Sequence, residues 1–374
     1  MAQSIKLLAP NVGWLVPARN RVLWTTDGGL EWKNITPPAP RDAAISAIFF
    51  LDTARGWVLF MRGAVDAPGN LHFDLASTEN AGATWSMEPL KIPDQLSRLL
   101  FNGGASLAFA DPRHGLLALA TGLTPISEGY GAVLATSDGG KTWKDTHTSL
   151  AGSIVMVTPE FGWLVGGGDL EALHVTRDGA RTWQQVELDS PVKTEQMQKA
   201  DRNLKQFWDS FQRAIPPAAA QLAAKRPEHE TYAAYDLPTF SDPRHGYICV
   251  TYPGVTVLFA TDDGGVTWRP DRVLTGLQEQ DQGDTMASAV VNSAWITARV
   301  PKNGVPQLRA LGAGAHAVAS TAPGPEDFRV SGISFATPRQ GWVLTVYNKL
   351  LSTNDGGASW TDITPGKKPP AVTP

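Results

Sequence analysis

One eight-residue pattern recurs six times along this chain of 374 residues and constrains its fold more than any other feature. Each copy runs Thr-x-Asp-x-Gly-x-x-Trp, except that Asn80 replaces the Asp in the second copy and Ala180 replaces the glycine in the fourth. The third position holds Asp27, Asn80, Asp138, Asp178, Asp263 and Asp355, and the last holds Trp32, Trp85, Trp143, Trp183, Trp268 and Trp360. A short Asp side chain accepts backbone N–H bonds and Gly supplies a positive φ, so each copy predicts a turn that closes a hairpin. Turn formation explains every residue of the pattern, so we interpret these Asp and Trp side chains as structural.

A second element, a glycine and an aromatic or apolar residue that open a strand, precedes the turns. Its seven copies begin at Gly13, Gly56, Gly115, Gly162, Gly246, Ala294 and Gly341. Further strand-like runs lie upstream, which gives about four strands per unit, as a propeller blade requires. The sequence therefore predicts an all-β, seven-bladed β-propeller over residues 1–374 as one domain.

One unit lacks the turn pattern. The interval between Trp268 and Trp360 is too long for one repeat of roughly 40 to 50 residues. We place this unit at about 286–329, with its third strand at Ala315 to Ser320 and a degenerate hairpin around Pro323 to Phe328. The chain starts with a first-strand pattern and stops after a fourth-strand pattern at Trp360 to Thr364, so no strand exchange between the termini is expected.

Residues 190–235 interrupt the repeats and predict a helical insertion between blades. Apolar residues recur there at three- and four-residue spacing, and Pro216 and Pro217 end the pattern: Met197, Leu204, Phe207, Trp208, Phe211 and Ile215. This spacing predicts a helix of about 20 residues, with a shorter Ala-rich helix after it at 218–224. The apolar stripe either packs on the propeller or, with Trp208, covers a partner or a ligand entrance. In the second case we expect Lys199, Arg202, Lys205 and Arg213 to be exposed for partner binding.

Long connections are predicted to gather on the face opposite the turns, and we expect binding there because loops on a rigid scaffold carry function. A second hypothesis concerns the turn face, where arginines precede the glycine-aromatic openings at equivalent positions: Arg55, Arg113, Arg244 and Arg339. They either meet an acidic peptide or tail, or are solvated turn residues with weak ion pairs. His114 and His245 stand in two copies of one Asp-Pro-Arg-His turn and are interpreted as turn residues and not as a metal pair.

Charge and composition argue against several function classes. The formal net charge of −4 and the isoelectric point near 6.0 do not suggest a nucleic-acid or anionic-lipid surface. No stretch approaches the roughly 18 apolar residues of a membrane span. The lone Cys249 forms no internal disulfide, and no spacing predicts a metal site or a nucleotide loop, so we expect no metal, no cofactor and a monomer. Residues 1–4 lack the basic and apolar regions of a signal peptide, yet a strand-like run follows at once, so a periplasmic or otherwise exported location is expected, with the cytoplasm as the alternative.

The turn pattern and the Gly-Trp openings resemble the Asp-box, or BNR-repeat, propellers. Among these, the rhythm of Asp-x-x-x-Gly-Trp, strand and Thr-x-Asp-Gly-Gly-x-Thr-Trp most resembles the photosystem II stability and assembly factor family, over nearly the whole chain except 190–235. The resemblance implies a seven-bladed lumenal or periplasmic propeller that helps assemble membrane complexes. On this basis we expect a non-catalytic scaffold, an assembly factor or an accessory subunit, whose partner is a membrane-complex subunit or its exposed tail.

Sialidases share the Asp box, so a glycoside hydrolase or a carbohydrate-binding propeller is the alternative. Their chemistry requires an arginine trio, a Tyr nucleophile with a Glu partner, and an Asp acid/base, and their early Arg-Ile-Pro signature is absent here. The nearest early stretch, Val16 to Arg19, does not match it. Six tyrosines are present but no assembled motif, and we therefore expect no enzyme and no catalytic residue.

Overall fold

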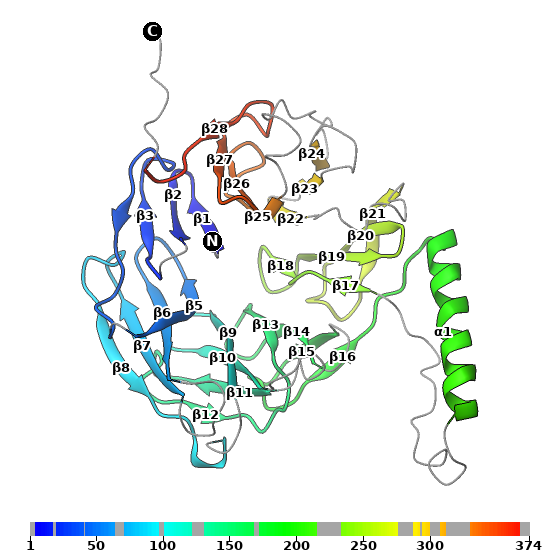
Figure 1. Cartoon of the computed structure of the whole chain (residues 1–374), viewed down its shortest axis with the longest axis horizontal. Helices are drawn as coiled ribbons and strands as arrows, with labels where there is room; N and C mark the ends of the chain where they lie inside the picture. Colours follow the sequence, from blue (N-terminus) through cyan, green and yellow to red (C-terminus); the bar gives the residue numbers. More distant parts are fainter. Residues whose placement is uncertain are drawn as a thin grey trace.

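The computed structural model describes residues 4–17, 20–40, 42–63, 71–96, 101–121, 131–167, 172–214, 233–275, 287–291, 294–299, 307–311 and 330–366. The chain is an all-β propeller with one α-helix, and its antiparallel sheets surround a common centre (Figure 1). The described strands form seven sheets, of which six have four or five strands and one has three.

The sheets follow one another along the chain, and each begins at the centre of the ring. Sheet one contains β1 (Ser4–Ala9), β2 (Val12–Val16), β3 (Leu23–Thr25) and β4 (Lys33–Asn34). Sheet two contains β5 (Ala44–Phe50), β6 (Gly56–Arg62), β7 (His72–Thr78) and β8 (Ser86–Leu90), and the 3-10 helix η1 (Asp94–Leu96) follows. Sheet three contains β9 (Phe101–Phe109), β10 (Gly115–Thr121), β11 (Gly131–Thr136) and β12 (Lys144–Asp145).

The second half of the ring holds the other four sheets. Sheet four contains β13 (Gly152–Met156), β14 (Gly162–Gly166), β15 (Leu173–Thr176) and β16 (Gln184–Val186), and the helix α1 (Glu195–Ala214) follows it. Sheet five contains β17 (Ala234–Tyr235), β18 (Thr239–Phe240), β19 (Gly246–Tyr252), β20 (Val255–Thr261) and β21 (Arg269–Thr275). Sheet six contains β22 (Ala287–Val291), β23 (Ala294–Arg299) and β24 (Gln307–Leu311). Sheet seven contains β25 (Val330–Phe335), β26 (Gly341–Thr345), β27 (Leu350–Thr353) and β28 (Thr361–Asp362).

Sheet six corrects one sequence prediction. Its third strand is β24 at Gln307–Leu311, which pairs with β23, and the prediction of Ala315 to Ser320 as the third strand is wrong. Residues 315–320 and the hairpin expected around Pro323 to Phe328 lie outside the described residues. Backbone pairing with β23 places the third strand at Gln307–Leu311, because strand formation depends on the neighbouring strand as well as on the segment's own sequence.

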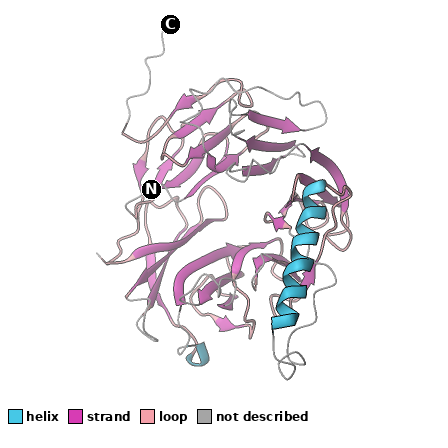
Figure 2. Cartoon of the chain, turned by 45° about the vertical axis from the view of Figure 1, so that its right-hand side comes forward, coloured by secondary structure: helices cyan, strands magenta, loops and turns pink. Residues whose placement is uncertain are grey.

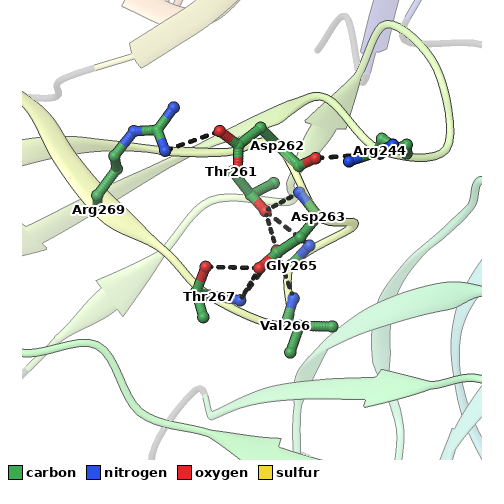
Figure 3. Close-up of polar contacts among 8 residues, drawn as sticks. All are labelled: Arg244, Thr261, Asp262, Asp263, Gly265, Val266, Thr267 and Arg269. Atoms are coloured by element: carbon green, nitrogen blue, oxygen red, sulfur yellow. Dashed lines mark hydrogen bonds and ion pairs between the residues drawn. The ribbon is translucent and has the colours of Figure 1, made fainter.

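The six repeated turns share one hydrogen-bond pattern, which Figure 3 shows for the copy at Thr261. The Thr261 hydroxyl accepts the N–H groups of Asp263 and Gly265, at 3.3 and 2.8 Å, and donates to Asp263 Oδ1 at 2.8 Å. The Asp263 carboxylate accepts the backbone N–H and the hydroxyl of Thr267, at 3.0 and 2.6 Å. Gly265 has a φ of 73°, and Ala180 adopts the corresponding left-handed conformation at 67° in the fourth copy. Each turn therefore satisfies its own polar groups, as expected of a structural element.

A second contact places each turn beside the loop between the first and second strands of the same sheet. The residue that follows the Asp or Asn donates its N–H to a carbonyl of that loop at 2.8 to 2.9 Å in all six copies. The donor–acceptor pairs are Gly28–Asn11, Ala81–Ala54, Gly139–Arg113, Gly179–Glu160, Gly264–Arg244 and Gly356–Arg339. These loops therefore share one face of the ring, which we call the turn face. The opposite face, reached by the loops between second and third strands and by the connections between sheets, is called the insertion face.

The core lies between neighbouring sheets, because the second and third strands are covered on both sides. Trp163, Trp295 and Trp342 open second strands and are at most 1% exposed. Trp57 of sheet two stacks on Phe109 of sheet three, with ring centroids 3.7 Å apart. Burial of such large side chains between sheets supplies the main apolar stabilisation of the ring.

Sheets one and seven close the ring through side-chain packing, and each is formed from consecutive strands, in agreement with the expectation of no exchanged strand. Leu7 and Leu15 pack with Trp342 and Ile363 in one buried cluster. The backbone N–H of Leu7 donates to Ser334 Oγ at 2.8 Å, and Trp32 Nε1 donates to the Ile363 carbonyl at 3.3 Å.

The helix α1 lies at the outside of the ring beside sheets four and five (Figures 1 and 2). Thr194 caps it, because its hydroxyl accepts the Met197 N–H at 3.1 Å and donates to the Pro253 carbonyl in the β19–β20 loop at 2.5 Å. The preceding segment is held at Leu188, whose N–H donates to the Tyr235 hydroxyl and whose carbonyl accepts from Tyr252. The predicted helix of about 20 residues is thus confirmed, while the shorter helix predicted at 218–224 lies outside the described residues.

Candidate functional site

A cleft of about 410 Å³ opens at the centre of the ring, where the inner strands of sheets four, five and six meet. Its polar side chains come from β13, β19, β22 and the segment that contains β17 and β18, and apolar side chains of β14, β22 and the β17–β18 connection complete the lining. The residues described along it are Ser153, Val165, Tyr235, Asp236, Leu237, Thr239, Tyr247, Cys249, Ser288, Ala289 and Val290. Ser153 and Ser288 are the second residues of the first strands β13 and β22, and Val165 is the penultimate residue of the second strand β14, so the cleft reaches toward the insertion face.

Asp236 is the carboxylate of this cleft and sits between β17 and β18. Its backbone N–H donates to the Cys249 carbonyl at 3.0 Å, which fixes it against the second strand of the sheet. Ser288 of the neighbouring sheet donates its hydroxyl to Asp236 Oδ2 at 2.5 Å. The carboxylate therefore links sheets five and six across the wall of the cleft.

The surroundings of Asp236 disfavour its charge. Asp236 is exposed to the cleft, but partial desolvation by the surrounding protein raises the pKa of its carboxyl despite hydrogen bonds from Ser288 and the Cys249 thiol. The pKa of the Cys249 thiol is raised well above its usual value, mainly by burial and to a lesser degree by the charge of Asp236. Cys249 is 3% exposed, as expected for a structural thiol, and it stays protonated as a donor to Asp236.

The cleft's described lining contains no Lys, Arg or His, and no ion pair to Asp236 is found in the described part of the chain. Desolvation, and to a lesser degree the charges of the exposed Glu187 and Asp189, raise the pKa of Tyr235, whose hydroxyl bonds Leu188 beyond the outer strand β16. Asp236 is therefore the one charged side chain in the described lining of the cleft. Elsewhere, on the inner strand of sheet one, Lys6 is also water-accessible yet enclosed, and desolvation lowers its pKa.

The partner-binding residues predicted on the insertion lie away from this cleft lining. Lys199, Arg202 and Lys205 are exposed along α1, whose first turn packs Met197 against the core between sheets four and five. Trp208 and Arg213 belong to α1, but their side chains lie outside the described part of the structure.

The four predicted arginines all lie on the turn face, but they do not share one position. Arg113 and Arg244 donate their Nε atoms to the carbonyls of Ser137 and Asp262, and Arg339 holds the same place in its loop. Arg55 falls one residue later, in the place of the histidines, and bonds Asp52 with Nε at 2.8 Å.

His114 and His245 bond Asp111 and Asp242 in the way that Arg55 bonds Asp52, each through Nδ1 at 2.8 Å. Backbone N–H bonds of the same turns complete this pattern. Both histidines thus act within turns, and no group of three or more metal-ligating side chains occurs among the described residues.

The carboxylates of the repeated turns are engaged locally. Hydrogen bonds from Thr267 lower the pKa of Asp263 most strongly. At Asp138, desolvation raises the pKa, but hydrogen bonds from Thr142 and Thr136 together lower it by more, and the pKa falls to about 2. Such carboxylates stay ionised at neutral pH, so none of them is suited to act as a general acid.

Sequence reasoning missed Asp236, Ser288 and Thr239. None belongs to a repeat, and Ser288 and Thr239 are small polar residues in short strands. A useful signal was available at Asp236, a carboxylate placed directly where the insertion ends and an inner strand begins, because inner strands of a propeller line its centre.

The arrangement suits recognition by hydrogen bonds and charge. Glycoside hydrolysis canonically requires two carboxyl groups flanking one bond, and the described lining supplies one. The cleft volume falls within the range of ligand pockets. No described helix is long and apolar enough to cross a membrane.

No protein-family model matches the chain, and a comparison with curated proteins gives no match. Solved structures are similar to it. A Mycobacterium tuberculosis puromycin-hydrolyzing peptidase is 11% identical with a TM-score of 0.53, and the match covers 100% of this chain and 54% of that one. An ancestral GH74 enzyme is 11% identical with a TM-score of 0.50, covering 97% of this chain and 46% of that one.

A structure of YCF48 bound to a D1 peptide is 15% identical with a TM-score of 0.47, covering 87% of this chain and 82% of that one. The chain thus spans about half the length of the peptidase and of the GH74 enzyme. At these identities the similarity concerns the fold and not the activity.

Proposed function

We propose that this protein is a non-catalytic propeller that binds a segment of another protein in the central cleft, from the insertion face. The observation that carries the proposal is the cleft itself, because its wall joins three sheets and presents hydroxyls and one carboxylate over an apolar floor. A pocket with few placed polar groups is typical of a binding site. A single carboxylate supports binding over hydrolysis.

We infer that the three-stranded sheet β22–β24 is the sixth blade of a seven-bladed ring and that the repeated turns are Asp boxes. The repeat pattern's resemblance to the photosystem II assembly factor family supports a role as assembly factor or accessory subunit of a membrane-associated complex. An exported, periplasmic location belongs to the same proposal.

Affinity purification of the tagged protein from its native host tests the proposal. Thr239 is exposed and lines the cleft, so Thr239→Trp fills the site without replacing a core residue. Thr26 is exposed in a turn of the turn face, so Thr26→Trp is the matched control. We expect specific membrane-complex subunits with the wild type and Thr26→Trp, and their loss with Thr239→Trp.

Two results contradict the proposal. Equal recovery of the same subunits with both variants would place binding outside the cleft. Turnover of oligosaccharides by the purified protein, abolished by Asp236→Asn, would establish the glycoside hydrolase alternative.

A further inference from the structure

Among the described residues, the Asp236 carboxylate accepts hydrogen bonds from neutral side chains and has no cationic partner. Its Oδ2 accepts the Ser288 hydroxyl and its neighbour Cys249 offers a thiol, both neutral donors. The described lining of the cleft contributes no basic side chain. Asp236 is exposed to the cleft, so an entering cation reaches the carboxylate and gains a charge-assisted hydrogen bond.

Asp236 is the one charged side chain in the described lining of the cleft, so the lining carries a negative charge. Complementary charge steers a cationic partner and selects against an anionic one.

The shape of the cleft selects among cations. Its volume of about 410 Å³ exceeds that of an ammonium group, and Val165, Leu237 and Val290 line it together with the polar residues. A lysine side chain combines an aliphatic stem with a compact head that carries three donors. Asp236 and the hydroxyls of Ser153 and Thr239, on three different inner-strand segments, are the acceptors that the lining offers such a head.

We propose, building on the proposed protein-binding function, that the cleft takes a lysine side chain of the partner segment and that Asp236 is its counter-ion. The specificity follows from the charge, because acetylating the lysine keeps its length and removes the cation. A guanidinium pairs best with a carboxylate through both oxygens, and the Ser288 bond to Oδ2 disfavours that bidentate arrangement. Lysine is therefore preferred over arginine.

Binding of short peptides to the purified full-length protein tests this inference by isothermal titration calorimetry. The probes are an acetylated and amidated Gly-Ala-Lys-Ala-Gly and its counterparts with Nε-acetyllysine, arginine or norleucine at the centre, together with n-butylamine. We expect the lysine peptide to bind at least about 10-fold more tightly than the acetyllysine and norleucine peptides. Asp236→Asn keeps an acceptor for Ser288 and should abolish this difference, whereas Thr26→Trp should leave it unchanged.

The other outcomes overturn the inference. Equal binding of the lysine and acetyllysine peptides, or a preference that persists in Asp236→Asn, would remove Asp236 as the counter-ion. Tighter binding of the arginine peptide would replace lysine by guanidinium recognition, and n-butylamine binding as tightly as the peptide would indicate a free amine as ligand. Capture of the same host protein by wild type and Asp236→Asn, without lysine discrimination, would leave the proposed function intact and refute the lysine site. Lysine discrimination without any captured host protein would support the lysine site and contradict the proposed function.

Discussion

Replacing Thr261 by Val removes one hydroxyl from the interior of a repeated turn and tests whether these turns hold the blades together. Thr261 is 4% exposed, and valine matches its shape and β-branching. The change leaves the buried N–H of Gly265 without its acceptor at 2.8 Å and removes a donor to the Asp263 carboxylate (Figure 3). An unsatisfied buried donor costs about 1–3 kcal/mol, so we expect a destabilisation of about 1–3 kcal/mol.

Thr267→Val supplies the matched comparison within the same turn. It removes a hydroxyl that bonds the other oxygen of Asp263 at 2.6 Å, but on an exposed side chain where water replaces the bond. We expect a loss of about 1 kcal/mol or less. Thr261→Ser retains the hydroxyl and should recover most of the stability lost in Thr261→Val.

Equilibrium urea unfolding followed by tryptophan fluorescence measures these differences, provided that the slopes of the transitions agree. A Thr261→Val protein within about 0.5 kcal/mol of the wild type, or no less stable than Thr267→Val, would refute the argument that the buried hydroxyl organises the turn.

Three further predictions concern acid, the helix and the cleft. The pKa of Asp138 falls from 3.8 to about 2 on folding, so its contribution to stability is present above about pH 4 and is lost as the pH falls toward 2. Asp138→Asn should therefore flatten the dependence of stability on pH between pH 4 and pH 2. An unchanged dependence, measured by urea unfolding, would contradict this prediction. Thr194→Ala removes the cap of α1 at a cost of about 1 kcal/mol. It should speed tryptic cleavage at Lys199 and Arg202 without shifting the main unfolding transition. Thr194→Ser retains the hydroxyl and should behave as the wild type. Desolvation raises the pKa of Asp236, so its ionisation opposes folding above about pH 3.8. Without ligand, Asp236→Asn should therefore raise the melting temperature at pH 8 but not at pH 3. A fall in the melting temperature at pH 8 would contradict this prediction.

The repeats made the β-propeller predictable because turn chemistry is local. A Thr, an Asp and a Gly at fixed spacing specify the same backbone wherever they occur, and the Gly-Trp openings mark second strands such as β6 and β14 at their first residues. The helix α1 was predictable for a similar reason, since apolar spacing and a following Pro-Pro are short-range signals. Sheet six, which lacks the turn, is where strand placement failed, at β24.

The cleft was not predictable because it is assembled from residues far apart in the chain. Ser153, Asp236 and Ser288 come from three sheets and meet only when the inner strands surround one centre. Nothing in the local sequence of Ser288 indicates its bond to Asp236. The arginines of the turn face show a second reason for error. Arg55 and Arg113 both precede a glycine-aromatic opening, but Arg55 lies one residue later in its turn and bonds Asp52, whereas Arg113 bonds the Ser137 carbonyl.

The most direct test of the central claim places a photocrosslinking benzoylphenylalanine at position 239 in the cleft, and separately at position 26 on the turn face, in the native host. The account predicts that irradiation links a discrete host protein to position 239 and not to position 26, and that excess lysine peptide competes with the crosslink. A crosslink at position 26 alone would contradict the account and place the interaction on the turn face.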